Sequence, residues 1–313
     1  MAQTPLQPLS VGNVVSAAFR LYRDRFATYL GIAIQASLWI LVPFLAILPI
    51  PFLFAFGQAE LSSLWIIIPL WLIFFFWCMA KYVMNSALIS RLSFGILANQ
   101  PETVREARSQ VAPKTWTFLW SSLLTILIIY GVFLAFYAAI FLAILVGSFI
   151  IALLSQSGIP SAIPTLIISI VAIVLLFLGL VFLIRFVTRF CIVEVPLAIE
   201  NKLTATQTIG RSRSLTQGNI DRIFWIFIVG GLISLPLQII ASIVGNVSQA
   251  ILARSLAIEP NSGLFIATNL IVSYILGIIL GSVLIPFWQS IKATIYYDLR
   301  SRKEGLDLQL RDR

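Results

Sequence analysis

Long uncharged segments dominate the pattern of hydrophobic and polar positions along the chain. Five segments contain no Asp, Glu, Lys or Arg: residues 26–59, 61–80, 115–184, 223–253 and 260–291. One transmembrane helix needs about 20 apolar residues, because each residue adds about 1.5 Å along the helix axis. The segment 115–184 is therefore long enough for two helices, and the polar, proline-containing stretch 155–164 divides it. The pattern predicts six membrane-spanning helices.

The distribution of basic residues supports this number of spans and orients them. We expect the spans near residues 27–55, 63–81, 116–154, 163–185, 223–253 and 264–291. Of the 21 Lys and Arg residues, only Arg254 then falls in an outer connection. Because loops rich in Lys and Arg stay in the cytoplasm, both termini are predicted to be cytoplasmic. The sequence thus predicts an all-α, polytopic helical bundle.

The overall composition excludes a soluble globular domain. Hydrophobic residues make up 60% of the chain and charged residues 11%, whereas soluble domains carry about 25% charged residues. The formal net charge of +9 follows from the topology and also favours anionic lipid headgroups. We therefore expect anionic membrane lipids as partners and no nucleic acid; a membrane or cytoplasmic protein is an alternative partner.

The chain also shows a weak internal repeat of three units, residues 10–99, 103–200 and 204–299, followed by a charged cytoplasmic tail at 300–313. Each unit opens with Ser or Thr followed three residues later by an amide or acid, which is a helix-start signal. These pairs are Ser10–Asn13, Thr103–Glu106 and Thr204–Gln207. A threefold repeat of helical hairpins explains the pattern; the alternative is that helix ends on one membrane side simply resemble one another.

The first unit opens with an amphipathic segment at residues 10–23. Apolar residues recur there at helical spacing. They are Val11, Val14, Val15, Ala18, Phe19 and Tyr22. Such a helix lies at the cytoplasmic membrane interface with its apolar face in the lipid, or packs that face against the bundle itself. A weaker stripe at 103–111 gives a second candidate interfacial helix.

The residues needed for most catalytic chemistry are missing. There is no His, and two isolated Cys residues do not make a zinc or iron–sulfur site. The sequence therefore predicts no metal, no cofactor and no conventional enzyme. The remaining catalytic alternative is a pair of carboxylates such as Glu194 and Asp298, which nothing in the sequence brings together.

Five charged residues near the predicted inner ends of spans form the candidate site. Lys81, Arg189 and Lys292 each follow a long apolar segment, and Arg185 precedes Arg189 by one helical turn. Around a threefold inner rim they would bind an anionic headgroup through charge-assisted hydrogen bonds; the alternative is ordinary snorkelling to the interface. Glu194 lies in an apolar stretch and needs a basic partner, either Arg189 or a cation from another unit.

Two short stretches resemble a known family. Residues 9–26, LSVGNVVSAAFRLYRDRF, and residues 296–308, YYDLRSRKEGLDL, are similar to the ends of the membrane-domain family named after glycerophosphoryl diester phosphodiesterases. The segment Val193–Glu200 is a looser match. The resemblance implies an integral protein of the bacterial cytoplasmic (inner) membrane. It does not imply phosphodiesterase activity, because the catalytic domain of those enzymes is a separate soluble barrel with His and a divalent metal.

Together these features predict a non-catalytic membrane scaffold or accessory protein whose basic cytoplasmic face engages anionic lipid or a partner protein. The main alternative is a transporter of lipid or another amphiphile with a site near the inner rim. An intramembrane enzyme is the third alternative.

Overall fold

The computed structural model describes residues 10–47, 61–157, 160, 162–201, 203–255 and 263–305. These residues form helices and turns, with no strand among them. Six helices are long and apolar enough to cross a membrane, which confirms the predicted number of spans. They are α2 (Phe26–Ile47), α4 (Leu64–Leu97), α6 (Thr115–Gln156), α7 (Ala162–Thr188), α10 (Ile220–Ser255) and α11 (Gly263–Glu304). The predicted end of the first span, residue 55, lies outside the described residues.

Short helices precede or connect the long ones. They are α1 (Val11–Asp24), η1 (Leu61–Ser63), α5 (Val104–Val111), η2 (Ala112–Lys114), α8 (Glu194–Ile199) and α9 (Ala205–Thr216). The predicted caps are present at the starts of α1, α5 and α9. The side chains of Ser10, Thr103 and Thr204 each accept a hydrogen bond from the backbone N–H three residues later. Thr103 and Thr204 form complete capping boxes.

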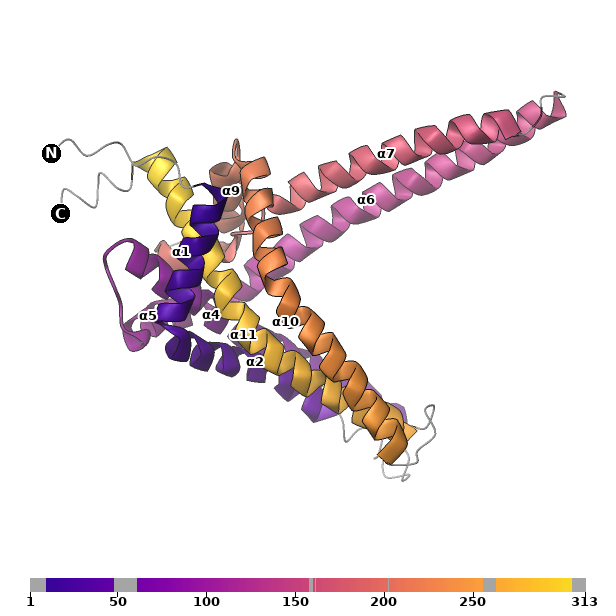
Figure 1. The fold of residues 1–313 in the computed structure, drawn as a ribbon. Helices are drawn as coiled ribbons and strands as arrows, with labels where there is room; N and C mark the ends of the chain where they lie inside the picture. Colours follow the sequence, from indigo (N-terminus) through magenta and orange to yellow (C-terminus); the bar gives the residue numbers. More distant parts are fainter. Residues whose placement is uncertain are drawn as a thin grey trace.

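Most of these short helices gather at one end of the molecule. There α1, α5, α8 and α9 pack around the last turns of α4 and α11 and the first turns of α6 and α10, a region that we call the base (Figure 1). Its core contains fully buried apolar side chains from several helices, including Leu88, Ile192, Leu197 and Tyr296. The base is therefore a packed helical layer rather than a set of loops.

Two spanning helices continue further into the base than the uncharged segments indicate. The second and sixth spans were expected to end at residues 81 and 291, but α4 continues to Leu97 and α11 to Glu304. The added turns are mostly buried, because small and apolar residues there pack against α1 and α8. Residue Asn99, with a φ of 54°, turns the chain after α4. Residues 300–304 of the predicted tail are thus helical.

The apolar stripe of α1 packs against the protein. Its buried residues are Val14, Val15, Ala18, Leu21 and Tyr22. They contact α10 and α11, and the Tyr22 hydroxyl donates a hydrogen bond to the Val283 carbonyl at 3.0 Å. Of the two alternatives for this stripe, the structure shows packing against the bundle. Two aromatic residues near the end of α1 are exposed: Phe19 of α1 and Phe26, the first residue of α2.

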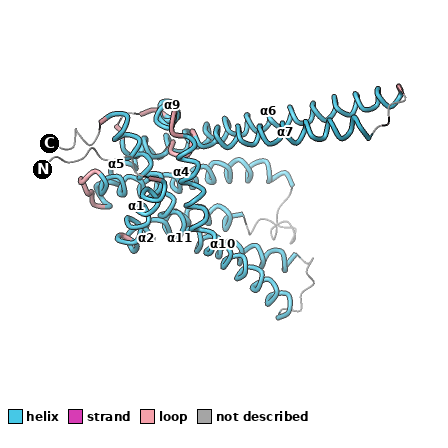
Figure 2. Tube along the Cα trace, turned by 45° about the horizontal axis from the view of Figure 1, so that its top comes forward, coloured by secondary structure: helices cyan, strands magenta, loops and turns pink. Residues whose placement is uncertain are grey.

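The six long helices diverge from the base as two bodies. Helices α2, α4, α10 and α11 pack together, whereas α6 and α7 pair with each other and leave the base as a separate hairpin, the arm (Figure 1, Figure 2). Helix α6 contacts α4, and α7 contacts α10, only through a limited region near the base. The structure therefore has three helical hairpins, but the second stands apart; the threefold repeat remains a prediction.

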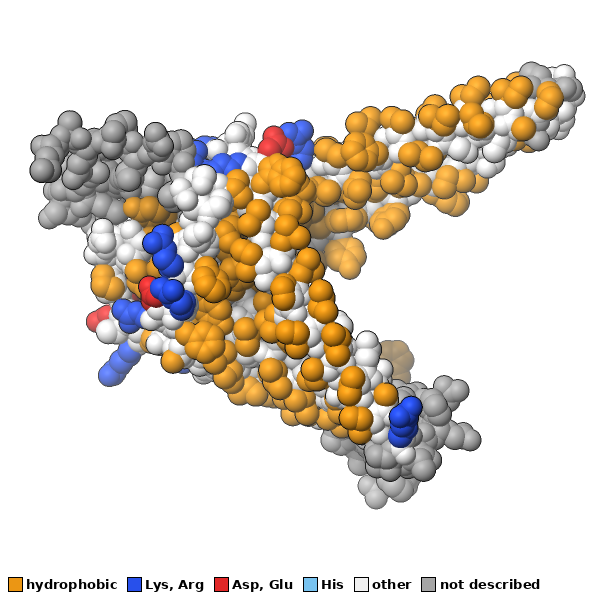
Figure 3. All heavy atoms as spheres, viewed as in Figure 1, with side chains coloured by type: hydrophobic (Ala, Val, Ile, Leu, Met, Phe, Trp, Pro, Cys, Tyr) orange, Lys and Arg blue, Asp and Glu red, His pale blue; other side chains and the backbone are white. Residues whose placement is uncertain are grey.

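The arm has the surface expected of helices in lipid. Exposed Leu, Ile, Val and Phe side chains cover it along most of its length (Figure 3). Helix α6 runs without a break through Gly131, and its 42 residues extend about 63 Å. Since the hydrocarbon core of a bilayer is about 30 Å thick, this helix fits only with a steep tilt or with turns outside the core.

Candidate functional site

The short helix α8 lies at the centre of a polar network in the base. The Glu194 carboxylate, at its first residue, accepts hydrogen bonds from Lys292 Nζ at 2.5 Å and from Gln289 Nε2 at 2.8 Å. Both donors belong to α11. The side chains of Glu194 and Lys292 are 17% and 23% exposed. The basic partner predicted for Glu194 is therefore present, and it comes from another unit rather than from Arg189.

Hydroxyl groups of α4 extend this network. Gln289 Nε2 also donates to Ser86 Oγ at 2.8 Å, and the Ser90 hydroxyl donates to Gln289 Oε1. Gln289, Ser86 and Ser90 are each at most 4% exposed. Buried polar groups are costly unless they are hydrogen bonded. Gln289 satisfies this condition by joining α4, α8 and α11 through one side chain.

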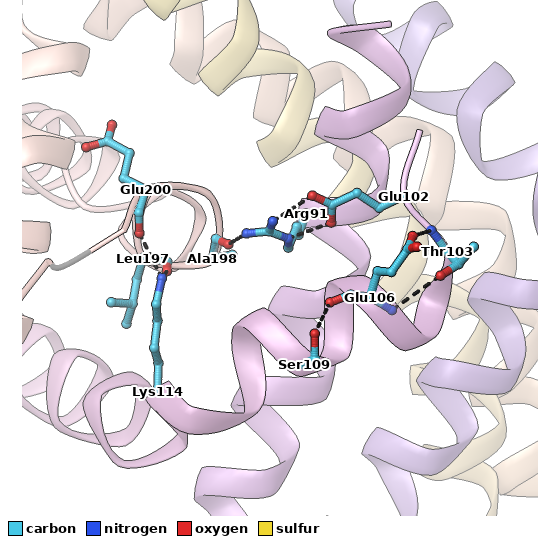
Figure 4. A network of polar contacts seen from close by, with 9 residues as sticks. All are labelled: Arg91, Glu102, Thr103, Glu106, Ser109, Lys114, Leu197, Ala198 and Glu200. Carbon is cyan, nitrogen blue, oxygen red and sulfur yellow. Dashed lines mark hydrogen bonds and ion pairs between the residues drawn. The ribbon is translucent and has the colours of Figure 1, made fainter. Parts of the chain in front are cut away.

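Two cations from other helices hold the carboxyl end of α8 (Figure 4). Arg91 of α4 donates to the Ala198 carbonyl at 2.7 Å and forms a two-point contact with Glu102, with nitrogen–oxygen distances of 2.6 and 2.7 Å. Lys114 of η2 donates to the carbonyls of Leu197 and Glu200 at 3.0 and 2.8 Å. The last carbonyls of a helix have no intrahelical partner and carry partial negative charge. Arg91 and Lys114 supply both the hydrogen bonds and the opposite charge.

The other carboxylates of the base are also paired. Glu200 accepts from Arg211 Nε at 3.0 Å and from the Tyr296 hydroxyl. Asp298 pairs with Arg222 at 2.7 Å and with Arg302 at 3.1 Å. Within the described residues, no hydrogen bond or shared cation links Asp298 to Glu194. Glu194, Glu200 and Asp298 thus pair with different cations, as expected for structural ion pairs.

Arg185 and Arg189 line a different cavity, between the end of α7 and the start of α10. The cavity has a volume of about 360 Å³, and Phe182, Phe186 and Asp221 complete much of its wall. Arg185 donates to both carboxylate oxygens of Asp221, at 2.6 and 2.7 Å. Arg189 Nε is buried and has no hydrogen-bond partner among the described residues.

Lys81 stands apart from both groups. Its ammonium group lies 5.9 Å from the centre of the Trp77 ring, a cation–π contact typical of a cation at an aromatic boundary. Within the described part of the chain, no hydrogen bond or ion pair joins the Lys81 side chain to Glu194 or Arg189. The five predicted site residues thus separate into the pair Glu194–Lys292, the pair Arg185–Arg189 and Lys81 alone.

Neither cysteine has a site suited to redox or metal chemistry among the described residues. Burial raises the pKa of the Cys191 thiol to about 12, so it stays protonated and a poor nucleophile at neutral pH. Cys78 is buried in α4. The described residues include no group of three or more Asp, Glu, Cys or His side chains placed to hold a metal ion.

The fold and this network define a polytopic helical membrane protein with an ion-paired base. Comparison of the chain with protein-family models, with curated proteins and with solved structures finds no match. The resemblance to the phosphodiesterase-associated membrane-domain family therefore remains a proposal from the residues that carry it.

Proposed function

We propose that this chain is a non-catalytic protein of the bacterial cytoplasmic membrane, with its base on the cytoplasmic side, and that the base binds anionic lipid headgroups as part of a scaffold or accessory role. The supporting observation is a set of four exposed arginines without a counter-ion. Arg20 and Arg25 flank the end of α1, Arg105 lies on α5 and Arg213 on α9. None of the four side chains makes an ion pair or hydrogen bond within the described residues.

These arginines are unpaired because the carboxylates of the described base bind other groups. Every carboxylate of the described base is already occupied: seven belong to ion pairs, and Glu106 closes the capping box of α5. Among the described residues, the base therefore has excess positive charge that no carboxylate neutralises, and Figure 3 shows blue side chains on this part of the surface.

Exposed aromatic residues support a lipid rather than a protein as the partner of this charge. Phe19 and Phe26 lie beside Arg20 and Arg25, and their side chains are 47% and 45% exposed. Exposed tryptophans occur in the first turns of α6 and α10, where these helices leave the base. They are Trp116, Trp120 and Trp225. Trp and Tyr concentrate at the headgroup level of bilayers, so these tryptophans support a position of the base, with its arginines, near that level.

A charge-removal experiment tests this proposal. The chain with Arg20, Arg25, Arg105 and Arg213 all replaced by Gln is expected to lose most of its preference for phosphatidylglycerol over phosphatidylcholine. Each basic residue near an anionic surface contributes about 1 kcal/mol. The preference is measured with spin-labelled lipids around the protein in mixed vesicles at low salt.

The matched control replaces the same four arginines by Lys, which keeps the charge and is expected to keep the preference. High salt should weaken the preference of the native chain, because it screens exposed charges. A lipid preference that is identical in the Gln and Lys variants would contradict the proposal. A protein that co-purifies with the native chain but not with the Gln variant would instead favour the partner-protein alternative.

A further inference from the structure

A cleft between α2 and α11 is the strongest unexplained feature of the membrane-spanning part. Its volume is about 470 Å³, within the range of small-molecule sites. Ser37 and Ile40 of α2 form one wall, Ser273 and Gly277 of α11 form the other, and Tyr82 of α4 lies on the lining. Because the cleft lies between two helices that are long and apolar enough to span a membrane, an occupant would enter it from the bilayer.

Small residues along α11 keep the cleft open. Ser273, Gly277 and Gly281 recur every four residues, a spacing that usually lets two helices approach closely. Gly230 of α10 allows α10 and α11 to approach closely, because a Cβ atom at this position would lie 2.9 Å from the side chain of Ile291. At Gly277, by contrast, a Cβ atom would meet no heavy atom within 4 Å. Gly277 therefore faces a space that the described residues do not fill, whereas a Cβ atom at Gly281 would lie 3.8 Å from the Ser37 hydroxyl oxygen.

The size of the cleft favours a slender occupant. An α-helix about 10 Å wide and 5.4 Å in pitch occupies about 400 Å³ per turn. The cleft thus holds about one turn, whereas a helix of a second copy needs about five turns to cross the membrane. An extended hydrocarbon chain is much thinner than a helix, and the isoleucines on both walls offer it an apolar surface.

A polar group, the Tyr82 hydroxyl of α4, lies on the lining of the cleft. This hydroxyl makes no hydrogen bond within the described residues. The cleft therefore combines a mostly apolar wall with an unpartnered hydroxyl. This is the chemistry of an amphiphile site.

We propose that the cleft binds one acyl chain of a membrane phospholipid, with the headgroup end of the lipid directed toward Tyr82. This site is independent of the four exposed arginines, so either proposal can fail without the other. The proposal assigns a function to Gly277 and Tyr82, two residues whose presence in the cleft is not explained by packing within the described residues.

Filling the cleft tests the proposal. The full chain is purified in mild detergent, and bound lipid is measured by native mass spectrometry. The native protein is expected to retain one phospholipid, and Gly277→Leu is expected to lower its occupancy by at least about tenfold, because the leucine side chain takes the place of several methylene groups. Ser273→Leu, which fills the same cleft from another position, is expected to act in the same direction.

The matched control is Gly131→Leu, which adds the same side chain to an exposed glycine of the arm, also without a contact within 4 Å. It should retain lipid as the native chain does. Tyr82→Phe should lower occupancy by about fivefold, the effect of one hydrogen bond. Lipid retained equally by Gly277→Leu and Gly131→Leu would overturn the proposal, as would a free fatty acid in place of the phospholipid or a dimer that Gly277→Leu disrupts.

Discussion

Lys292→Met is expected to lower the free energy of unfolding by about 3 kcal/mol, because it leaves the Glu194 carboxylate partly buried without its cation. Gln289 still donates one hydrogen bond to this carboxylate, at 2.8 Å, but supplies no charge. The measurement is reversible unfolding of the detergent-solubilised protein in SDS, followed by circular dichroism.

A double-mutant cycle separates this pair from its surroundings. Combining Lys292→Met with Glu194→Gln removes both charges, so the double variant is expected to be more stable than the sum of the two single effects by about 2 kcal/mol. Arg185→Gln is the exposed control. Its ion pair with Asp221 has side chains that are 52% and 70% exposed, and its loss should cost about 0.5 kcal/mol or less. Additive effects of Lys292→Met and Glu194→Gln would show that the two groups do not interact.

Arg91→Gln is expected to have a similarly large effect, also about 3 kcal/mol. The Arg91 side chain is 13% exposed, and its loss removes the two-point contact with Glu102 and one of the groups that hold the end of α8. The same unfolding experiment measures the change.

Arg91→Lys distinguishes charge from geometry at this position. A lysine keeps the charge but cannot form the planar two-point contact and reach Ala198 together, so it is expected to recover only about half of the loss. Serine replacement of the exposed residue Arg105 provides a surface control with little effect on stability. Full stability of Arg91→Lys would show that charge alone holds α8.

The number of spanning helices was predictable from the sequence, whereas their grouping was not. Uncharged length decides whether a segment can cross the membrane, and it identified all six. No sequence pattern indicates that α6 and α7 separate from the other helices, because a leucine that faces lipid and a leucine that faces another helix are the same residue in the sequence. The continuation of α4 beyond Lys81 was missed for a related reason: the charge of Lys81 was interpreted as the end of the span, although residues 83–90 are buried.

The candidate site was predictable only in part. The cost of a carboxylate in an apolar stretch required a cation near Glu194, but Lys292 is 98 residues away, and only the packing of α8 on α11 selects it. Arg91 and Lys114 were missed, because the excess of basic over acidic residues in the chain was attributed to membrane topology. Their partners are mainly backbone carbonyls, which no local sequence pattern identifies.

The orientation of the base is the claim on which the proposed function depends most directly, and labelling of single cysteines tests it. In a chain with Cys78 and Cys191 replaced by Ala, cysteine is placed at Arg105, Arg213 or Arg254 and treated with a membrane-impermeant maleimide. In sealed vesicles of both orientations, positions 105 and 213 should react only from the cytoplasmic side, and position 254 only from the opposite side. Labelling of positions 105 and 213 from opposite sides, or of 254 from the same side as both, would contradict a single cytoplasmic base.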